Sequence, residues 1–140
     1  MPTWLVYALL ATLFAGLTSV LAKFGLQKIN ADLGLAIRTA VVFILVTLNL
    51  FAWSGHKDYS QLTARTIIFL ALSGATTALS WIFYYRAIKL GTVSYVAAID
   101  KSSIVITILL SFLFLKEPMT PKLIAGATLI FAGMVVLIWK

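Results

Sequence analysis

The stretch VSYVAAIDKSSIVITILLSFLFL, residues 93–115, is mostly apolar, yet it holds two adjacent charges, Asp100 and Lys101. An α-helix rises 1.5 Å per residue, so roughly 20 apolar residues cross the hydrocarbon core of a bilayer, which is about 30 Å thick. The length of this stretch therefore predicts a transmembrane helix. What its two charges do depends on the solvent in which the whole chain folds.

The rest of the chain repeats the pattern, with further apolar blocks at 4–22, 33–53, 66–85 and 123–139. Hydrophobic residues make up 62% of the chain, whereas soluble domains have about 45–50%. The blocks also lack the charged outer face that helices of a soluble bundle carry. We therefore expect an all-α, polytopic membrane protein with five transmembrane helices, forming a single domain over residues 1–140.

The composition argues against several function classes. The short linkers leave no room for a soluble domain, and the absence of cysteine excludes disulfide and thiol chemistry. One histidine, His56 in a polar loop, and four acidic residues provide no catalytic triad or metal cluster, so we expect neither an enzyme nor a cofactor. The net charge of +7 is better explained by basic side chains at lipid headgroups than by nucleic-acid binding. No basic residue precedes the first apolar block, which argues against a cleaved signal peptide.

Five spans place the termini on opposite sides of the membrane; we call the N-terminal side A and the other side B. Side A receives Lys57, Arg65, Lys116 and Lys122, and side B receives Lys23, Lys28, Arg86, Lys89 and Lys140. Orientation follows the difference in Lys and Arg between short loops, and this difference is small. If Arg38 and Lys101, which fall within spans, are also counted for side B, side B has seven basic residues against four on side A, which is a modest bias. Two alternatives stay open: copies inserted both ways that pair as an antiparallel dimer, or one orientation with side B in the cytoplasm.

Polar residues align along one side of three predicted helices. The aligned sets are Thr12, Gly16, Ser19 and Lys23 in the first, Ser73, Thr77, Ser80 and Tyr84 in the third, and Asp100, Ser103, Thr107 and Ser111 in the fourth. Small and hydroxylated residues also stabilise packing between membrane helices, which is the alternative explanation. We expect these three helices to face a shared polar interior. The fifth helix, with its small residues, would pack outside against a partner chain.

Aromatic residues gather near the side-B end of the third predicted helix, at Trp81, Tyr84 and Tyr85. They form either part of an interfacial belt or the wall of a pocket for a partly apolar solute. Trp4, Trp53 and Trp139 lie at the ends of blocks and are typical of interfacial anchors.

The charges within the spans need partners, because an ionised residue near the bilayer centre costs about 2.5–3.5 kcal/mol. Adjacent residues on a helix do not face each other, so we expect Asp100 and Lys101 not to neutralise one another. At 1.5 Å per residue, Asp100 lies roughly 10–12 Å and Arg38 roughly 7–8 Å inside side B. We therefore expect Asp100 to pair with Arg38 or Lys23, either as a structural ion pair or within a translocation pathway. The surplus positive charge of Arg38, Asp100 and Lys101 would suit a carboxylate or another anionic group.

The candidate solute-binding residues combine these charges with the aligned hydroxyl and aromatic groups. They are Arg38, Ser73, Thr77, Ser80, Trp81, Tyr84, Asp100, Lys101 and Ser103.

Three stretches carry a family resemblance: WIFYYRAIKLGTVSYVAAIDKSS (81–103), LLSFLFLKEPMT (109–120) and LIAGATLIFAGMVVL (123–137). An apolar run ending in Leu-x-Glu-Pro, followed by a short linker and Gly-Ala-x-Leu-Ile-x-x-Gly, resembles the EamA-type domain of the drug/metabolite transporter superfamily. Most members of that family look like two fused five-helix units, one inverted relative to the other. This chain holds one unit and resembles the single-unit members.

The resemblance implies an antiparallel homodimer of ten helices around a central cavity, with the fifth helix at the periphery. It also implies transport of small metabolites such as amino acids or related compounds, often by export, across the inner (plasma) membrane of a prokaryote. The transporter would work by alternating access, without a cofactor. The first helix lacks the acidic residue of the smaller multidrug relatives, so Asp100 is the acid that could couple protons. The alternative is a non-transporting membrane scaffold or accessory subunit beside a larger partner.

Overall fold

The computed structural model describes residues 2–54 and 62–139, apart from the side chains of residues 53 and 54. Within these ranges the chain is helical and contains no strand. Five helical spans are long and apolar enough to cross a membrane: Thr3–Gly25, Ala31–Ala52, Ala64–Leu90, Val93–Leu115 and Pro121–Ile138. The predicted all-α architecture with five transmembrane helices is thereby confirmed. The expectations for His56, Lys57 and Lys140 lie outside the described residues.

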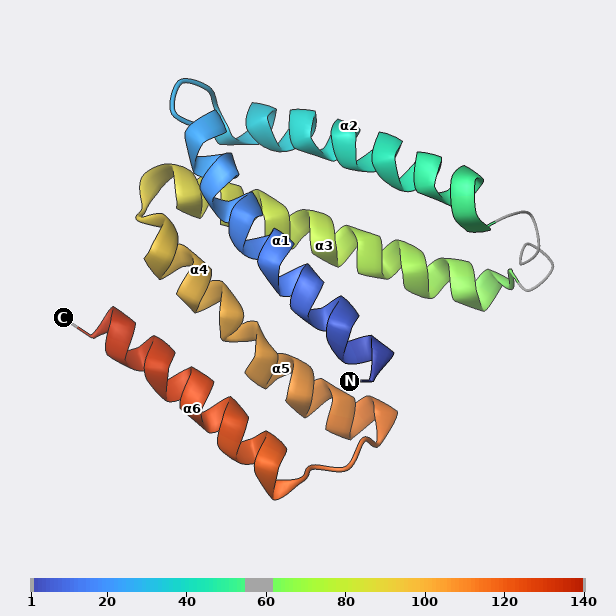
Figure 1. Ribbon diagram of the computed structural model, residues 1–140, viewed down its shortest axis with the longest axis vertical. Coiled ribbons are helices and arrows are strands. Elements are labelled where there is room, and N and C mark those ends of the chain that lie inside the picture. Colours follow the sequence, from blue (N-terminus) through green and yellow to red (C-terminus); the bar gives the residue numbers. More distant parts are fainter. Residues whose placement is uncertain (1, 55–61, 140) are drawn as a thin grey trace. The chain divides into compact units, whose positions relative to one another are not determined.

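The chain divides into two compact units, Met1–Leu90 (unit 1) and Gly91–Lys140 (unit 2), and each is described by itself. Unit 1 contains α1 (Thr3–Gly25), α2 (Ala31–Asn49) with its π-helical continuation η1 (Leu50–Ser54), and α3 (Ala64–Leu90) (Figure 1). Unit 2 contains α4 (Val93–Lys101), α5 (Ser103–Leu110), the π-helical η3 (Ser111–Leu115) and α6 (Pro121–Ile138). That residues 1–140 form a single domain stays a prediction.

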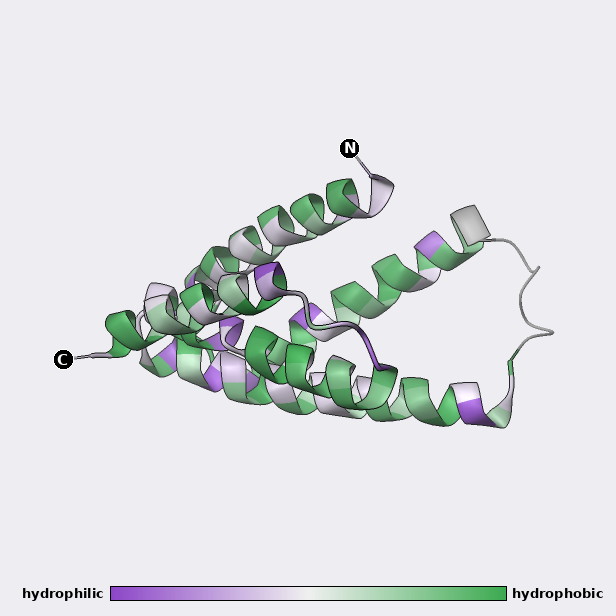
Figure 2. Ribbon diagram, turned by 90° about the horizontal axis from the view of Figure 1, so that it is seen from below, coloured by the Kyte–Doolittle hydropathy of each residue, from purple (hydrophilic) through white to green (hydrophobic). Residues whose placement is uncertain are grey.

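In unit 1, α3 packs against both α1 and α2. The buried side chains gather near the side-B ends of these helices: Ser19, Leu26, Ala31, Leu35, Tyr85 and Ile88. Elsewhere, large apolar side chains such as Leu13 and Phe83 are 58% and 66% exposed. Hydrophobic residues dominate along the helices (Figure 2). A chain with so much apolar surface needs lipid or further protein around it.

The third span is longer than predicted, because α3 continues beyond residue 85 to Leu90. Arg86 and Lys89, which we expected in a loop, therefore lie in the last turns of α3. The prediction was wrong because basic residues interrupt an apolar run without ending a helix. Cationic side chains are favourable at a helix C-terminus, where the carbonyl groups carry partial negative charge. Lys23 lies in the last turn of α1 for the same reason.

The N-termini of two helices follow local capping rules. At α2, the side chain of Asn30 accepts a hydrogen bond from the backbone N–H of Asp32 at 2.7 Å. At α6, the hydroxyl of Thr120 accepts one from the backbone N–H of Leu123 at 3.2 Å, and Pro121 occupies the first helical position. These caps satisfy donors that the helix leaves unpaired.

The fourth span, Val93–Leu115, runs through without leaving the helical conformation, but its α-helical hydrogen bonding is interrupted at one residue, Ser102, between α4 and α5. At the break, the backbone N–H of Ser102 bonds the carbonyl of Ile99 at 3.0 Å, and the N–H of Val105 bonds the carbonyl of Ser102 at 3.0 Å. The Ser102 hydroxyl also donates to the carbonyl of Ile99, at 2.6 Å. The span thus contains a tight turn directly after its two charges.

In unit 2, α6 packs against α4 and α5. A Cβ atom added at Gly126 or Gly133 would meet no atom of the described chain within 4 Å. The small residues at these positions are therefore not explained by close packing within the unit. That this helix packs against a partner chain stays a prediction.

Candidate solute-binding site

The side chain of Arg38 extends from α2 onto two aromatic rings of α3. Its guanidinium carbon lies 4.1 Å from the centroid of the Trp81 ring and 5.7 Å from that of Tyr85. Such cation–π contacts contribute roughly 0.5–2 kcal/mol, and most when they are desolvated. The two rings hold the positive charge in place but do not neutralise it.

The guanidinium of Arg38 keeps hydrogen-bonding capacity. Its Nη1 atom is buried and has no hydrogen-bond partner among the described residues. The one acidic side chain in the described part of unit 1 is that of Asp32. It is already paired, because both of its carboxylate oxygens accept hydrogen bonds from Arg86, at 3.0 and 3.1 Å. A buried donor without a partner costs about 1–3 kcal/mol.

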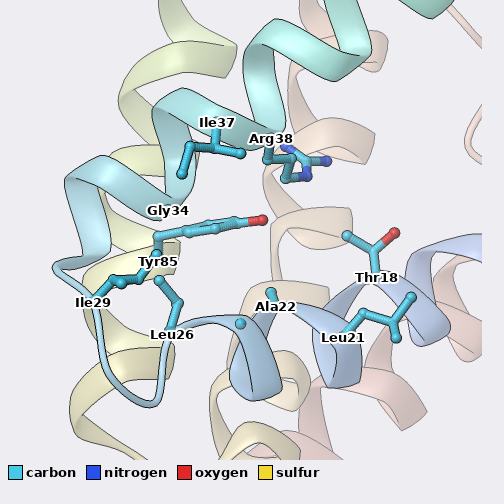
Figure 3. Close-up of a pocket in the computed structure, with 10 residues that line it drawn as sticks. Thr18, Leu21, Ala22, Leu26, Ile29, Gly34, Ile37, Arg38 and Tyr85 are labelled. Atoms are coloured by element: carbon cyan, nitrogen blue, oxygen red, sulfur yellow. The ribbon is translucent and has the colours of Figure 1, made fainter.

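A pocket with a volume of about 350 Å³ opens beside Arg38, within unit 1. Its lining comes from α1, the α1–α2 loop, α2 and one residue of α3: Thr18, Leu21, Ala22, Gly25, Leu26, Ile29, Gly34, Ile37, Arg38 and Tyr85. Figure 3 shows Leu26 and Ile29 toward one side of the pocket and Arg38 and Thr18 toward the other. The pocket therefore combines an apolar wall with a cationic group, as small-molecule sites commonly do.

The lack of a side chain at Gly34 allows the α1–α2 loop to approach α2. A Cβ atom built at Gly34 would collide with the Cδ2 atom of Leu26 and lie 3.4 Å from the Cδ1 atom of Ile29. Because Leu26 is 2% exposed, it has little space into which to move. Gly34 thus allows Leu26 and Ile29, which form the apolar wall of the pocket, to pack closely against α2.

Tyr84 joins the aligned polar residues of the first and third spans. Its hydroxyl lies 2.8 Å from the Oγ atom of Ser19, which is 8% exposed and also lies 3.1 Å from the carbonyl of Ala15. Since a serine hydroxyl has one proton, donation to Ala15 leaves the Tyr84 hydroxyl as donor to Ser19. The contact brings together two residues that the sequence pattern placed on a shared face.

The remaining candidates of α3 lie apart from this pocket. Ser73, Thr77 and Ser80 are exposed and do not belong to its lining. The hydroxyl of Thr77 donates to the carbonyl of Ser73 at 2.8 Å. Such a bond satisfies a hydroxyl group inside a membrane span, so the polar pattern alone does not distinguish a solute contact from a satisfied helix residue.

In unit 2, Asp100 and Lys101 contact each other. The Nζ atom of Lys101 lies 3.5 Å from Oδ2 of Asp100, with side-chain exposures of 64% and 37%. Our expectation that these neighbours would not pair was wrong, because the flexible stem of lysine reaches back at the end of α4. At this distance and exposure the pair is weak. Ser103 is exposed at the start of α5. Pairing of Asp100 with Arg38 or Lys23 would join the two units and stays a prediction.

Two polar contacts of unit 1 were missed from the sequence. One is the bidentate pair of Asp32 and Arg86. The other links Lys23 and Lys89 to carbonyl groups at the ends of each other's helices. The signal for both was charge at the side-B ends of neighbouring spans. In the described residues, no group of three or more His, Cys, Asp or Glu side chains could hold a metal ion.

In the described residues, five apolar spans define a multi-pass membrane protein, and one of its pockets is lined by the cation Arg38 and the ring of Tyr85. Residues 2–139 match the sequence model of the EamA-like transporter family, and the chain belongs to that family. The resemblance found in its C-terminal half is confirmed.

Two relatives are similar over most of the chain. The "Uncharacterized transporter in cobO 3'region" of Sinorhizobium sp. is 40% identical over 135 residues, which cover 96% of both proteins. Protein RarD of Streptomyces exfoliatus is 30% identical over 131 residues, which cover 84% of this chain and 39% of RarD. No solved structure shows a significant match.

The family and its members identify the chain as a membrane transporter and not an enzyme. The bacterial relatives place it in the plasma membrane of a prokaryote, where it contacts lipid and a solute.

Proposed function

We propose that this chain exports small metabolites, such as amino acids or related compounds, by alternating access as an antiparallel homodimer. The observation that carries the proposal is Arg38, a charged residue within a span whose buried Nη1 has no partner in the described chain and which borders a pocket of about 350 Å³. Ionised residues inside membrane spans commonly mark solute or ion pathways. This volume lies at the small end of ligand pockets, which suits a metabolite.

The contacts proposed for the solute begin with Arg38 and Trp81, which touch each other. Tyr84 supports the same region from α3 through Ser19. The other residues proposed for the pathway are Ser73, Thr77, Ser80, Asp100, Lys101 and Ser103.

The charges within the fourth span support a role for unit 2. Ionised residues within a membrane span commonly mark solute or ion pathways. Asp100 and Lys101 lie together within the fourth span, directly before Ser102.

Two observations support the antiparallel dimer. The Lys and Arg residues that the sequence assigns to loops and chain ends are divided nearly evenly between the two sides, which gives weak instruction for a single orientation. The chain also spans 39% of RarD, which leaves RarD enough length for a second unit of this size. Two inverted copies would then make the inverted repeat on which alternating access relies in many transporters.

The test is release of solutes from proteoliposomes that contain this chain alone. Vesicles are loaded with a mixture of amino acids, organic acids and amines, and the external solution is followed by mass spectrometry. We expect at least one solute to leave faster than from protein-free vesicles. Correctly folded protein that releases none of them would favour the non-transporting scaffold.

A further inference from the structure

The charge of the pocket in unit 1 is unbalanced. Among the described residues that line it, Arg38 is the one with a formal charge, and none carries a carboxylate. The carboxylate of Asp32 is bound by Arg86 through both oxygens. A ligand that neutralises the pocket therefore brings one negative charge.

A ligand group that binds Arg38 must accept hydrogen bonds, because a guanidinium has donors and no acceptor. Trp81 and Tyr85 contact the guanidinium through their rings, which leaves the buried Nη1 donor without a partner in the described chain. The planar fork of a guanidinium matches a carboxylate, to which it can donate two parallel hydrogen bonds.

The rest of the pocket suits an apolar body. Leu21, Leu26, Ile29 and Ile37 belong to its hydrophobic lining. The polar groups beside them are hydroxyls, and that of Thr18 already donates to the carbonyl of Phe14 at 2.8 Å. Burying an ammonium group here would cost several kcal/mol, because no opposite charge lines the pocket. The nearby rings of Trp81 and Tyr85 are already used by Arg38.

Building on the proposed transport of small metabolites, we infer that the Arg38 pocket selects apolar monocarboxylates over the zwitterionic amino acids of the same carbon skeleton. The carboxylate meets Arg38, and an alkyl or aryl body lies against the wall formed by Leu26 and Ile29. This narrows the solute class from amino acids and related compounds to acids without an amino group.

Three ligands that share a phenylethyl group test the inference on the unaltered protein. Binding of 3-phenylpropionate, phenylalanine and phenethylamine is measured by calorimetry with the protein in phosphatidylcholine nanodiscs. We expect 3-phenylpropionate to bind about tenfold or more tightly than phenylalanine, and phenethylamine to bind most weakly. Equal or tighter binding of phenylalanine would overturn the inference, whatever any variant does.

Variants then assign the selectivity to Arg38. Arg38→Ala should weaken binding of 3-phenylpropionate about tenfold or more, and Arg38→Lys should restore part of it, since lysine keeps the charge without the fork. Arg65→Ala is the matched control, because Arg65 also lies over a ring, Phe69 at 5.8 Å, outside the pocket lining. Unchanged affinity in a folded Arg38→Ala protein would overturn the assignment, and if that variant does not fold, Arg38→Lys and the ligand series decide.

Changing the lipid of the nanodiscs tests whether the pocket binds a free carboxylic acid or the headgroup of an anionic lipid. Nanodiscs containing phosphatidylglycerol should leave the affinity for 3-phenylpropionate within about threefold, whereas strong competition would assign the pocket to an anionic lipid.

The result of the binding experiment can be distinguished from the result of the transport experiment. Release of amino acids with no preference for the acid would contradict this inference and leave the transporter proposal intact. Tight binding of the acid without any transport would support this inference and contradict the transporter proposal.

Discussion

Lys23 and Lys89 each bind the C-terminal end of the other's helix. The Nζ atom of Lys23 on α1 donates to the carbonyl of Ile88 on α3 at 2.7 Å, and that of Lys89 donates to the carbonyl oxygens of Leu26 and Gln27, the latter at 3.1 Å. The last carbonyl groups of a helix lack intrahelical partners and carry partial negative charge. The exchange therefore joins the ends of α1 and α3 beside the Arg38 pocket.

We predict that Lys23→Met and Lys89→Met each lower the free energy of unfolding by about 1–3 kcal/mol, because each leaves carbonyl groups without a charged donor. Unfolding in mixed detergent micelles, followed by circular dichroism, measures the change. Lys28→Met serves as the control, since Lys28 is exposed in the loop after α1 and its replacement should change stability by less than about 0.5 kcal/mol. Equal losses of stability in Lys23→Met and Lys28→Met would argue against the hydrogen bonds that join the ends of α1 and α3.

The contact between Ser19 and Tyr84 predicts a coupling in a double-mutant cycle. Ser19→Ala and Tyr84→Phe each remove the same 2.8 Å hydrogen bond, so the double variant should be hardly less stable than either single one. Polar contacts between membrane helices contribute about 0.6 kcal/mol on average and up to about 1.7 kcal/mol. Additive losses would mean that the two hydroxyls do not interact in the membrane.

The spans could be predicted from the sequence, because length and hydropathy are local properties of the chain. The end of α3 could not, since the hydropathy pattern treats Arg86 and Lys89 as loop residues. Their partners, Asp32 and the carbonyl of Gln27, lie far away in sequence. The break at Ser102 was missed for a related reason: no glycine or proline marks it, and the local hydrogen bonds to Ile99 replace the helical pattern.

The candidate site was predictable in part. The sequence identified Arg38 and Trp81 as separate candidates, because a charge within a span and aromatic residues near its end are unusual features. Their contact depends on how α2 is rotated against α3, which the periodicity of one helix does not specify. Tyr85 was noticed in the aromatic cluster but not chosen as a site residue, although it is 4% exposed and lines the pocket.

The charges of unit 2 provide a prediction for transport. Asp100→Asn and Lys101→Ala should each reduce solute release from proteoliposomes about tenfold, since charges within spans commonly serve solute or ion pathways. Lys122→Ala, at the exposed start of α6, should leave the rate unchanged. Full activity in both Asp100→Asn and Lys101→Ala would remove these residues from the pathway.

Orientation can be measured directly. Two reporters, one active in the cytoplasm and one active outside the membrane, are fused in turn to the C-terminus. An antiparallel dimer predicts signal from both fusions, because copies insert both ways when the Lys and Arg difference is small. Signal from one fusion alone would contradict dual topology and leave a parallel assembly.

The central claim is that a solute crosses the membrane in contact with Arg38, and exchange of labelled solute by proteoliposomes of the chain alone tests it most directly. We predict that the unaltered protein and Arg65→Ala exchange the solute at similar rates, while Arg38→Ala, incorporated in equal amounts and folded, exchanges it at least about tenfold more slowly. Equal rates in Arg38→Ala and Arg65→Ala would contradict the account.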